Sequence, residues 1–349
     1  ENMVYFSKIG KSQMSQFSDK EVILSVFEYD FRENASADCF NIGYGIDRNF
    51  LFGCGVSIAS VLLSNKKIDF TFHIFTDYFD ESDKARFADL AKQYQSCIKV
   101  YLIDCNKLKD LPSTKNWTYA TYFRFVIADY FYNKIDKLLY LDADIACQGS
   151  VRELVDYKFS ADEIAVVVTE RDSEWWHNRS VTLATPELIT GYFNAGFLLI
   201  NINAWHSNNI SSRAIEMLRV PEWVERITHL DQDVLNVLLA GKVTFINGKY
   251  NTRFSINYEL KDKVVNPVNN ETVFIHYVGP TKPWHEWSNY PVSKSFLVAK
   301  EASPWHSVAL LKPTNSNQFR YCAKHKFKQG LYVQGLCNYF NYYLTKLKG

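Results

Sequence analysis

The chain has 349 residues, with 39 Lys and Arg against 38 Asp and Glu, so its formal net charge is +1. This length allows a substantial hydrophobic core and fits one large α/β domain with an appendage. The near-neutral balance argues against a general nucleic-acid-binding protein. The charge is nevertheless uneven, because no Asp or Glu follows Glu301, whereas Lys and Arg recur as far as Lys348. An acidic body thus precedes a basic tail.

The seven cysteines form no CxxC pair and match no zinc-ligand spacing. Most of them lie within apolar runs, so we expect reduced core thiols in a cytoplasmic protein. The N-terminal region lacks a basic segment followed by an apolar core, and no apolar run approaches about 18 residues. We therefore expect neither a signal peptide nor a transmembrane helix.

Residues 1–38 are polar and irregular apart from 22–27, which predicts an N-terminal extension that leads into or lies across the main domain. From residue 39 onward, strand-like and helix-like runs alternate, as is typical of a parallel sheet with helices on both faces. The predicted strands are 39–46, 70–76, 98–103, 138–141, 164–169, 197–202 and 273–277. The predicted helices are 53–63, 81–95, 119–130 and one that begins at 231.

Two polar residues, Asp47 and Asn49, directly follow the first predicted strand. Ligands in open α/β sheets bind at the carboxyl ends of strands, so both side chains are candidate ligand contacts, with helix capping as the alternative. The nearby glycines do not form GxGxxG, and the sequence has no GxxxxGK[ST] loop, which disfavours a dinucleotide site. A nucleotidyltransferase is disfavoured as well, because YGIDRN is not a glycine-rich loop carrying Lys or Arg after the strand.

We call the stretch KLLYLDADIACQG, residues 137–149, the central motif. It carries two acids at the end of an apolar run. The run predicts a strand that is buried on both faces. Asp142 and Asp144 at its end need partners or a cation, because an isolated buried carboxylate is costly. A bound divalent metal is one explanation, and an ordinary turn after the strand is the other.

Further polar residues stand out against apolar surroundings. Arg124 lies among aromatic residues of a predicted helix, so it should pair with an acid of the central motif or with a ligand phosphate. Glu170 and Asp172 end a predicted strand, and 175–177, with two Trp and a His, read as a loop with the composition of a sugar-stacking rim. Ordinary loop packing is the alternative for these aromatic residues.

The second half of the chain offers four more candidates. Asn194 precedes an apolar strand and is either a ligand contact or a turn cap. The Asp231 to Asp233 segment opens a helix, where capping explains the acids well. His276 ends a strand and Lys282 follows in a Gly/Pro loop, which resembles a metal ligand followed by a phosphate clamp. For His276 by itself, an ordinary core histidine is the stronger interpretation.

Taken together, six segments resemble glycosyltransferase family 8, the retaining transferases that include bacterial lipopolysaccharide galactosyl- and glucosyltransferases and, more distantly, glycogenin. The segments are YGIDRNFLFGCGVSIASVLL, TKNWTYATYFRF, LLYLDADIACQGS, GYFNAGFLLIN, HLDQDVLNVLL and IHYVGPTKPWHEW. They follow the family's order and extend over roughly 40–290. Together with YELKD and RYCAKHKF, they look closest to the subgroup of outer-core lipopolysaccharide α-1,3-hexosyltransferases.

This resemblance implies a GT-A fold with a mixed, mainly parallel sheet over 39–290, followed by a basic, aromatic extension over 291–349. It implies a metal site formed by Asp142, Asp144 and His276. The residues that it places at a UDP-sugar donor are Tyr44, Gly45, Asp47, Asn49, Arg124, Asp142, Ala143, Asp144, Asn194, Gln232, Gly279 and Lys282. The acceptor contacts that we expect are Glu170, Asp172, Trp175, Trp176 and Trp284.

The resemblance also implies a reaction. A hexose moves from its UDP-sugar to a glucose of the lipopolysaccharide core in an α-1,3 linkage, with UDP-galactose favoured over UDP-glucose and Mn²⁺ favoured over Mg²⁺. Asp142 and Asp144 then act at the metal. Gln232, with Asp233 alongside, lies where a nucleophile would be needed for a covalent intermediate, although attack from the leaving-group face is favoured.

The basic, aromatic tail over 319–349 suits an anionic membrane interface, which predicts a peripheral protein on the cytoplasmic face of the inner membrane. A packed helix pair with a solvated charged face is the alternative. A non-enzymatic nucleotide-sugar-binding protein is the competing function, and the presence of Asp142, Asp144 and His276 disfavours it.

Overall fold

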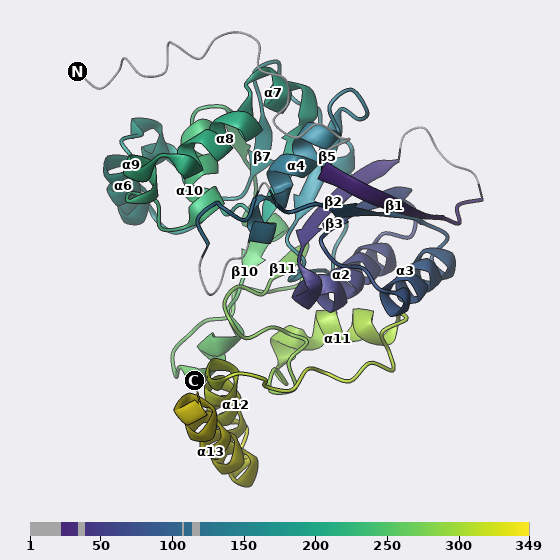
Figure 1. The fold of residues 1–349 in the computed structure, drawn as a ribbon, viewed down its shortest axis with the longest axis vertical. Helices are drawn as coiled ribbons and strands as arrows, with labels where there is room; N and C mark the ends of the chain where they lie inside the picture. Colours follow the sequence, from purple (N-terminus) through teal and green to yellow (C-terminus); the bar gives the residue numbers. More distant parts are fainter. Residues whose placement is uncertain (1–21, 34–38, 107, 114–118, 349) are drawn as a thin grey trace.

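The computed structural model describes residues 22–33, 39–106, 108–113 and 119–348, and its centre is an eight-stranded sheet (Figure 1). The strand order is β1-β4-β3-β2-β5-β8-β7-β9. The strands are β1 (Ile23–Asp30), β2 (Phe40–Ile46), β3 (Phe70–Thr76), β4 (Cys97–Ile103), β5 (Lys137–Leu141), β7 (Ala165–Val167), β8 (Phe197–Asn201) and β9 (Val243–Phe245).

The sheet is mixed, as predicted. Strands β4, β3, β2 and β5 run parallel to one another, as do β7 and β9, whereas β1 and β8 run antiparallel to their neighbours. From β2 the chain proceeds to β3 and β4 on one side and later places β5 on the other side. The carboxyl ends of β2 and β5 therefore meet where the strand order reverses, which is where such sheets bind ligands. Asp47 follows the first of these strands and Asp142 follows the second.

Helices cover both faces of the sheet (Figure 1). One core includes residues of α2 (Leu51–Ser64), α3 (Glu81–Gln93) and α11 (Lys294–Glu301). The other includes residues of α4 (Phe123–Tyr130), α7 (Ile202–Ser207), α8 (Ile210–Arg219) and α10 (Leu230–Leu238). On β5, Leu139 and Leu141 belong to the first core and Leu138 and Tyr140 to the second. Both faces of this strand are thus buried, which explains its continuous apolar run.

A second, three-stranded sheet lies next to the end of β5. It consists of β10 (Thr252–Arg253), β11 (Phe274–His276) and β6 (Ile145–Cys147), in that order. Strand β5 ends at Leu141 and β6 begins at Ile145, so the Asp142 to Asp144 segment connects the two sheets. The central motif is therefore a junction between two sheets.

Two elements differ from the prediction in their local form. The helix expected over 119–130 begins with a 3₁₀ turn, η3 (Tyr119–Tyr122), before α4. The loop expected around Trp175 and Trp176 was wrong, because both residues lie in α6 (Ser173–Thr182). Asp172 caps this helix by accepting a hydrogen bond from the Trp175 N–H at 2.9 Å. The capping residue was visible in the sequence, but the aromatic residues after it suggested an exposed rim.

The ends of the described chain differ in their placement. Strand β1, within the region predicted as an N-terminal extension, joins the sheet edge antiparallel to β4. The C-terminal region forms a helical hairpin, α12 (Ser316–Lys328) and α13 (Tyr332–Lys348), which projects from the body (Figure 1).

The fold also includes two short helices, α5 (Arg152–Val155) and α9 (Pro221–Val224). No helix among the described residues is long and apolar enough to cross a membrane. All seven cysteines are free and five are buried, as predicted, whereas Cys337 is exposed.

Close packing under the central motif involves a glycine of α2. A methyl group added at Gly53 would lie 2.4 Å from the Trp284 ring and 3.0 Å from the Ala143 carbonyl oxygen. Substitution Gly53→Ala should destabilise the protein by about 1–2 kcal/mol, because overpacking costs more than the helix propensity that alanine gains. Urea unfolding measures this change. Gly248→Ala, with no atom within 4 Å of the new methyl group, is the control. Equal stability of the two variants would contradict the packing argument.

Candidate functional site

The central acids are held by hydrogen bonds to both sheets. The Asp142 N–H donates to the Gly196 carbonyl next to β8 at 2.9 Å. The Asp144 carbonyl accepts from the Tyr277 N–H, directly after β11, at 3.0 Å. The backbone on either side of Ala143 is therefore fixed before any side-chain contact is considered.

His276 reaches the two acids from the second sheet. Strand β11 pairs antiparallel with β6 so that His276 lies opposite Ile145. The His276 Nε2 atom is 3.2 Å from Asp144 Oδ1 and 3.9 Å from Asp142 Oδ2. One ligand atom from each of the three residues lies within 4.8 Å of the others.

Lys282 approaches Asp144 from the following loop. Its Nζ atom is 2.5 Å from Asp144 Oδ2 and 2.9 Å from the Tyr277 carbonyl oxygen. Burial by itself would raise the pKa of Asp144, but the charges of Lys282 and His276 outweigh it and hold that pKa below its ordinary value. Asp144 is therefore ionised at neutral pH. Gly279 lies in the same loop as Lys282 and is exposed. Its φ of +89° is a conformation that glycine adopts without strain.

These residues fit a divalent cation. Among the described residues, the buried Asp144 Oδ1 atom has no hydrogen-bond partner. A methyl group at Gly196 would lie 2.5 Å from both Asp142 Oδ2 and His276 Cε1, so a glycine is needed to leave the cradle open. Two carboxylates and an imidazole are donors that suit Mn²⁺, and carboxylates also suit Mg²⁺.

Arg124 is buried and pairs with an acid of the central motif, as predicted. Its Nη2 atom is 3.2 Å from Asp142 Oδ1, and its Nε atom is 3.1 Å from Asp231 Oδ2. Its Nη1 atom donates to the Ala195 carbonyl at 2.5 Å. Arg124 thus links α4, the central motif, the start of β8 and the start of α10. Asp231 was not predicted to be a partner of Arg124, since its position at a helix start explained it sufficiently.

Gln232 has its side-chain amide fully occupied. Its Oε1 atom accepts from Asn194 Nδ2 at 3.0 Å and from the Ala195 N–H at 3.1 Å. Its Nε2 atom donates to Glu170 Oε2 at 3.1 Å and to the Tyr192 hydroxyl at 3.2 Å. Asn194 also donates to Glu170 at 3.1 Å. Three predicted site residues, Asn194, Gln232 and Glu170, are therefore brought together in one network.

Asp233 contacts this network through the Tyr192 hydroxyl, which donates to its Oδ1 atom at 2.7 Å, but it is buried behind Gln232, whereas the prediction placed it alongside Gln232 as a catalytic residue. Its side chain is fully buried and forms an ion pair with Arg179 at 2.6 Å. It also accepts from the Thr228 and His229 N–H groups at 2.7 and 2.8 Å. Burial would raise the pKa of Asp233, but these donors together lower it. The helix-start explanation fits Asp233, because the two N–H groups that donate to it lie at the entry to α10.

Of the predicted acceptor residues, only Glu170 bonds to Gln232. Glu170 is buried beside Gln232 and forms an ion pair with Arg253 at 2.6 Å. Trp175 and Trp176 are half-buried on α6, and Asp172 is its exposed cap. Trp284 is only 3% exposed and packs against Phe50 and Phe296. The expectation that Trp284 contacts an acceptor is therefore wrong, because its ring belongs to the core.

The candidate residues within β2 and directly after it make different contributions. The Tyr44 hydroxyl is 3.1 Å from Ser57 Oγ in the core, so only its main chain faces the end of the strand. A methyl group at Gly45 would lie 2.7 Å from Phe123 Cβ. The Asp47 carboxylate accepts the Asn49 N–H at 2.9 Å and caps η2 (Arg48–Phe50), while Asn49 is exposed.

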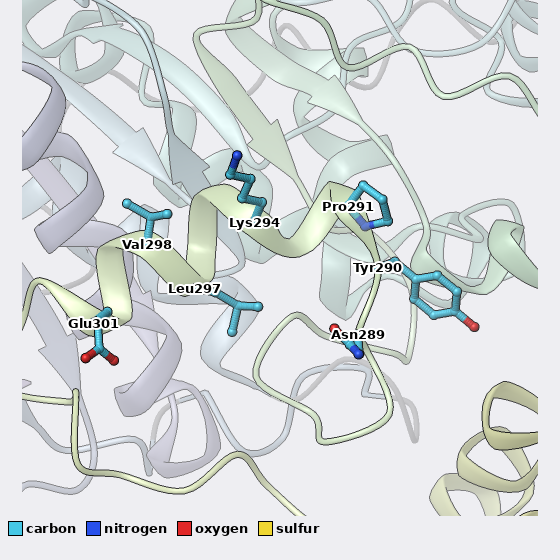
Figure 2. Close-up of a pocket in the computed structure, with 7 residues that line it drawn as sticks. All are labelled: Asn289, Tyr290, Pro291, Lys294, Leu297, Val298 and Glu301. Carbon is cyan, nitrogen blue, oxygen red and sulfur yellow. The ribbon is translucent and has the colours of Figure 1, made fainter. Parts of the chain in front are cut away.

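A groove of about 520 Å³ lies elsewhere, on the surface of α11 and the loop before it (Figure 2). Its lining residues lie within 289–301 and include Tyr290, Leu297 and Val298. None of them is a predicted site residue. The chemistry-bearing side chains thus gather at the sheet junction and not in this groove.

The fold that carries this junction is of the GT-A type. The galactosyltransferase LgtC, solved in complex with donor and acceptor sugar analogues, has a similar fold, with a TM-score of 0.63 and 24% identity over 76% of this chain and 96% of that chain. This comparison confirms the predicted fold class.

Sequence comparisons identify the family of this chain. The glycosyl transferase family 8 model matches residues 41–288, and the family 8 C-terminal model matches 290–346. A lipopolysaccharide 1,3-galactosyltransferase of Salmonella typhimurium is 61% identical over 95% of this chain and 98% of the relative. The lipopolysaccharide glucosyltransferase WaaO of Escherichia coli is 54% identical over the same shares. The chain belongs to glycosyltransferase family 8, as predicted.

The buried Arg124 contacts generate a stability prediction. Arg124→Met leaves the buried Asp231 without its cation, so it should lower the free energy of unfolding by about 3–5 kcal/mol. Urea unfolding at neutral pH measures the loss. Arg152→Met is the control, because Arg152 is exposed and 4.0 Å from Asp156, and a change within about 0.5 kcal/mol is expected there. A loss below about 1 kcal/mol for Arg124→Met would contradict the role of this pair.

Proposed function

We propose that this glycosyltransferase moves a hexose, galactose in preference to glucose, from a UDP-sugar to a glucose of the lipopolysaccharide core. The bond formed is an α-1,3 linkage, and the anomeric configuration is retained. The observation that carries this proposal is the convergence of Asp142, Asp144, His276 and Lys282 at the end of β5. The higher identity to the 1,3-galactosyltransferase than to WaaO supports galactose as the donor sugar. UDP-glucose is the alternative donor.

The metal site would be formed by Asp142, Asp144 and His276, with Mn²⁺ favoured over Mg²⁺. When bound, such a cation supplies a Lewis acid for the departing diphosphate. Arg124 holds the Asp142 carboxylate in place from the opposite side. Lys282 carries a positive charge on a loop beside Asp144, where it would stabilise the negative charge that develops on the leaving phosphate.

The donor would extend from the end of β2 to the Gln232 network. Asp47 and Asn49 are assigned to the uridine, Gly279 and Lys282 to the diphosphate, and Asn194 with Gln232 to the sugar. The backbone of Tyr44, Gly45 and Ala143 would form the floor between them. Glu170 lies next to Gln232 and is the acceptor contact that the geometry supports best.

Retention of configuration favours attack from the leaving-group face. The Gln232 carbonyl oxygen already accepts two hydrogen bonds, so it is a poor nucleophile for a covalent intermediate. In front-face attack, the bond between the anomeric carbon and the phosphate oxygen breaks as the acceptor oxygen bonds to that carbon. The departing phosphate takes the proton of the acceptor hydroxyl, so no protein base is needed.

The metal proposal is tested by charge removal. Asp142→Asn and Asp144→Asn should each lower hexose transfer at least about a hundredfold, equivalent to about 2.7 kcal/mol. Purified protein is assayed with Mn²⁺, a panel of UDP-sugars and truncated core lipopolysaccharides, and the product linkage is read by NMR. Chelation of divalent cations should abolish turnover, and added Mn²⁺ should restore it.

Asp156→Asn, at an exposed acid, is the matched control. Turnover near that of the wild type in either Asn variant would refute the metal assignment. Binding of UDP-sugar without any release of UDP would instead favour a nucleotide-sugar-binding protein.

The C-terminal hairpin supports a peripheral position on the cytoplasmic face of the inner membrane. Val333, Leu336, Phe340 and Leu347 are 63–84% exposed and recur at helical spacing on α13. Lys346 and Lys348 follow at the end of the same helix, further basic residues lie on α12, and no acid follows Glu301. An apolar stripe on a basic hairpin suits a surface of anionic lipid, such as the one that carries the proposed acceptor.

Acidic substitution on this stripe tests the membrane proposal. Leu336→Glu combined with Phe340→Glu should weaken binding to vesicles of phosphatidylethanolamine and phosphatidylglycerol at least about tenfold, since two apolar anchors are lost. Flotation of the protein with the vesicles measures this, and hydrolysis of UDP-sugar in the absence of lipid should not change. Val265→Glu, at an exposed valine outside the hairpin, should bind vesicles normally. Unchanged flotation of the double variant would remove the proposal.

A further inference from the structure

The buried amide of Asn251 lies behind His276, at the ring nitrogen that does not face the two acids. Asn251 ends η5 (Gly248–Asn251), directly before β10. Its Oδ1 atom is 3.0 Å from His276 Nδ1, and its Nδ2 atom is 3.1 Å from Asn194 Oδ1. Asn251 therefore contacts a candidate metal ligand on one side and a candidate sugar contact on the other.

The orientation of this amide follows from a backbone group. The Gly196 N–H lies 3.1 Å from Asn194 Oδ1, and a backbone N–H can only donate. The Asn194 atom must therefore be its oxygen, and the Asn251 atom that faces it must be the donating nitrogen. The remaining Asn251 atom, the carbonyl oxygen, faces His276 and can only accept. His276 consequently carries a proton on Nδ1.

A proton on Nδ1 decides what the other ring nitrogen presents. In the neutral imidazole, Nε2 is then the atom with the free lone pair. This lone pair points toward Asp144 Oδ1 at 3.2 Å and Asp142 Oδ2 at 3.9 Å. While the ring is neutral, three electron-rich atoms thus face one another, which is favourable only around a positive charge, either a second ring proton on Nε2 or a bound cation.

We propose that Asn251 is a positioning residue that holds the Nδ1–H tautomer of His276 and so directs Nε2 to a divalent cation. This inference rests on the proposed metal-dependent transfer. Without Asn251, the proton is better placed on Nε2, where it donates to Asp144 and removes the lone pair from the site. Loss of such an outer partner typically weakens metal affinity by about 10–100-fold.

The tautomer is measured on the full-length protein without metal, at a pH alkaline enough that the His276 ring is neutral. The chain contains eight histidines, so ¹⁵N-histidine NMR spectra are compared with those of His276→Gln to identify the His276 signals. The wild-type protein should show the Nδ1–H form, and Asn251→Ala should shift His276 toward the Nε2–H form. The Nε2–H form in the wild type, or the same tautomer in both proteins, would overturn the inference.

Metal affinity is measured separately, by EPR titration of Mn²⁺ in the presence of UDP. Asn251→Ala should bind Mn²⁺ about 10–100-fold more weakly than the wild type. Thr252→Ala, which removes a neighbouring hydroxyl bonded to the Gly248 carbonyl, should not change the affinity.

Failure of the positioning role and failure of the proposed metal dependence would give different results. Equal Mn²⁺ affinity of Asn251→Ala and the wild type would overturn the positioning role while leaving the metal site in place. A wild-type protein with the expected tautomer that binds no Mn²⁺ would instead overturn the proposed metal dependence.

Discussion

The cost of placing two carboxylates at the end of a core strand is the constraint on which this structure depends. Strand β5 is buried on both faces, yet it leads directly to Asp142 and Asp144. Charges in such a position need opposite charges and hydrogen bonds to persist. Three side chains from separate segments of the chain pair with these acids: Arg124 with Asp142, and Lys282 and His276 with Asp144. The segments that stabilise the acids are therefore also the segments that form the site.

The change of sheet at the central motif gives the two acids different surroundings. Asp142 is half-buried and remains hydrogen-bonded to the main sheet, with Arg124 beside it. Asp144 is buried, belongs to the second sheet through its carbonyl, and is held by Lys282. In a continuous strand, residues two apart would also share a face, but both would belong to one sheet. The junction instead bonds Asp142 to the main sheet and Asp144 to the second sheet, whose strand β11 brings His276 to the same cation site.

Local patterns in the sequence predicted the fold better than they predicted the contacts of the site. Strand β3 has the predicted bounds, because its alternation and polar flanks are local features. The partnership of His276 with Asp144 came only from the family resemblance, since the pattern around a lone histidine favoured an ordinary core residue. The contact between Asn251 and His276 joins residues 25 apart and left no signal in either segment. The burial of Asp233 and Trp284 was missed for the same reason, because an Asp near a helix start and a Trp in a Gly/Pro loop do not reveal which side of the chain will be covered.

The C-terminal hairpin is connected to the Lys282 loop through buried polar groups. His325 on α12 is 2.9 Å from Asn257 Oδ1 through Nε2 and 2.8 Å from the Tyr290 hydroxyl through Nδ1. Asn257, in η6 (Ile256–Leu260), also accepts from the Thr281 hydroxyl at 2.6 Å, one residue before Lys282. Burial lowers the pKa of His325 to about 4, so the ring is neutral and this network carries no charge at neutral pH. Because buried hydrogen bonds of this kind fix orientation, the hairpin should keep one direction relative to the loop. A surface bound by α13 would then lie at a constant distance from the carboxylates of the site.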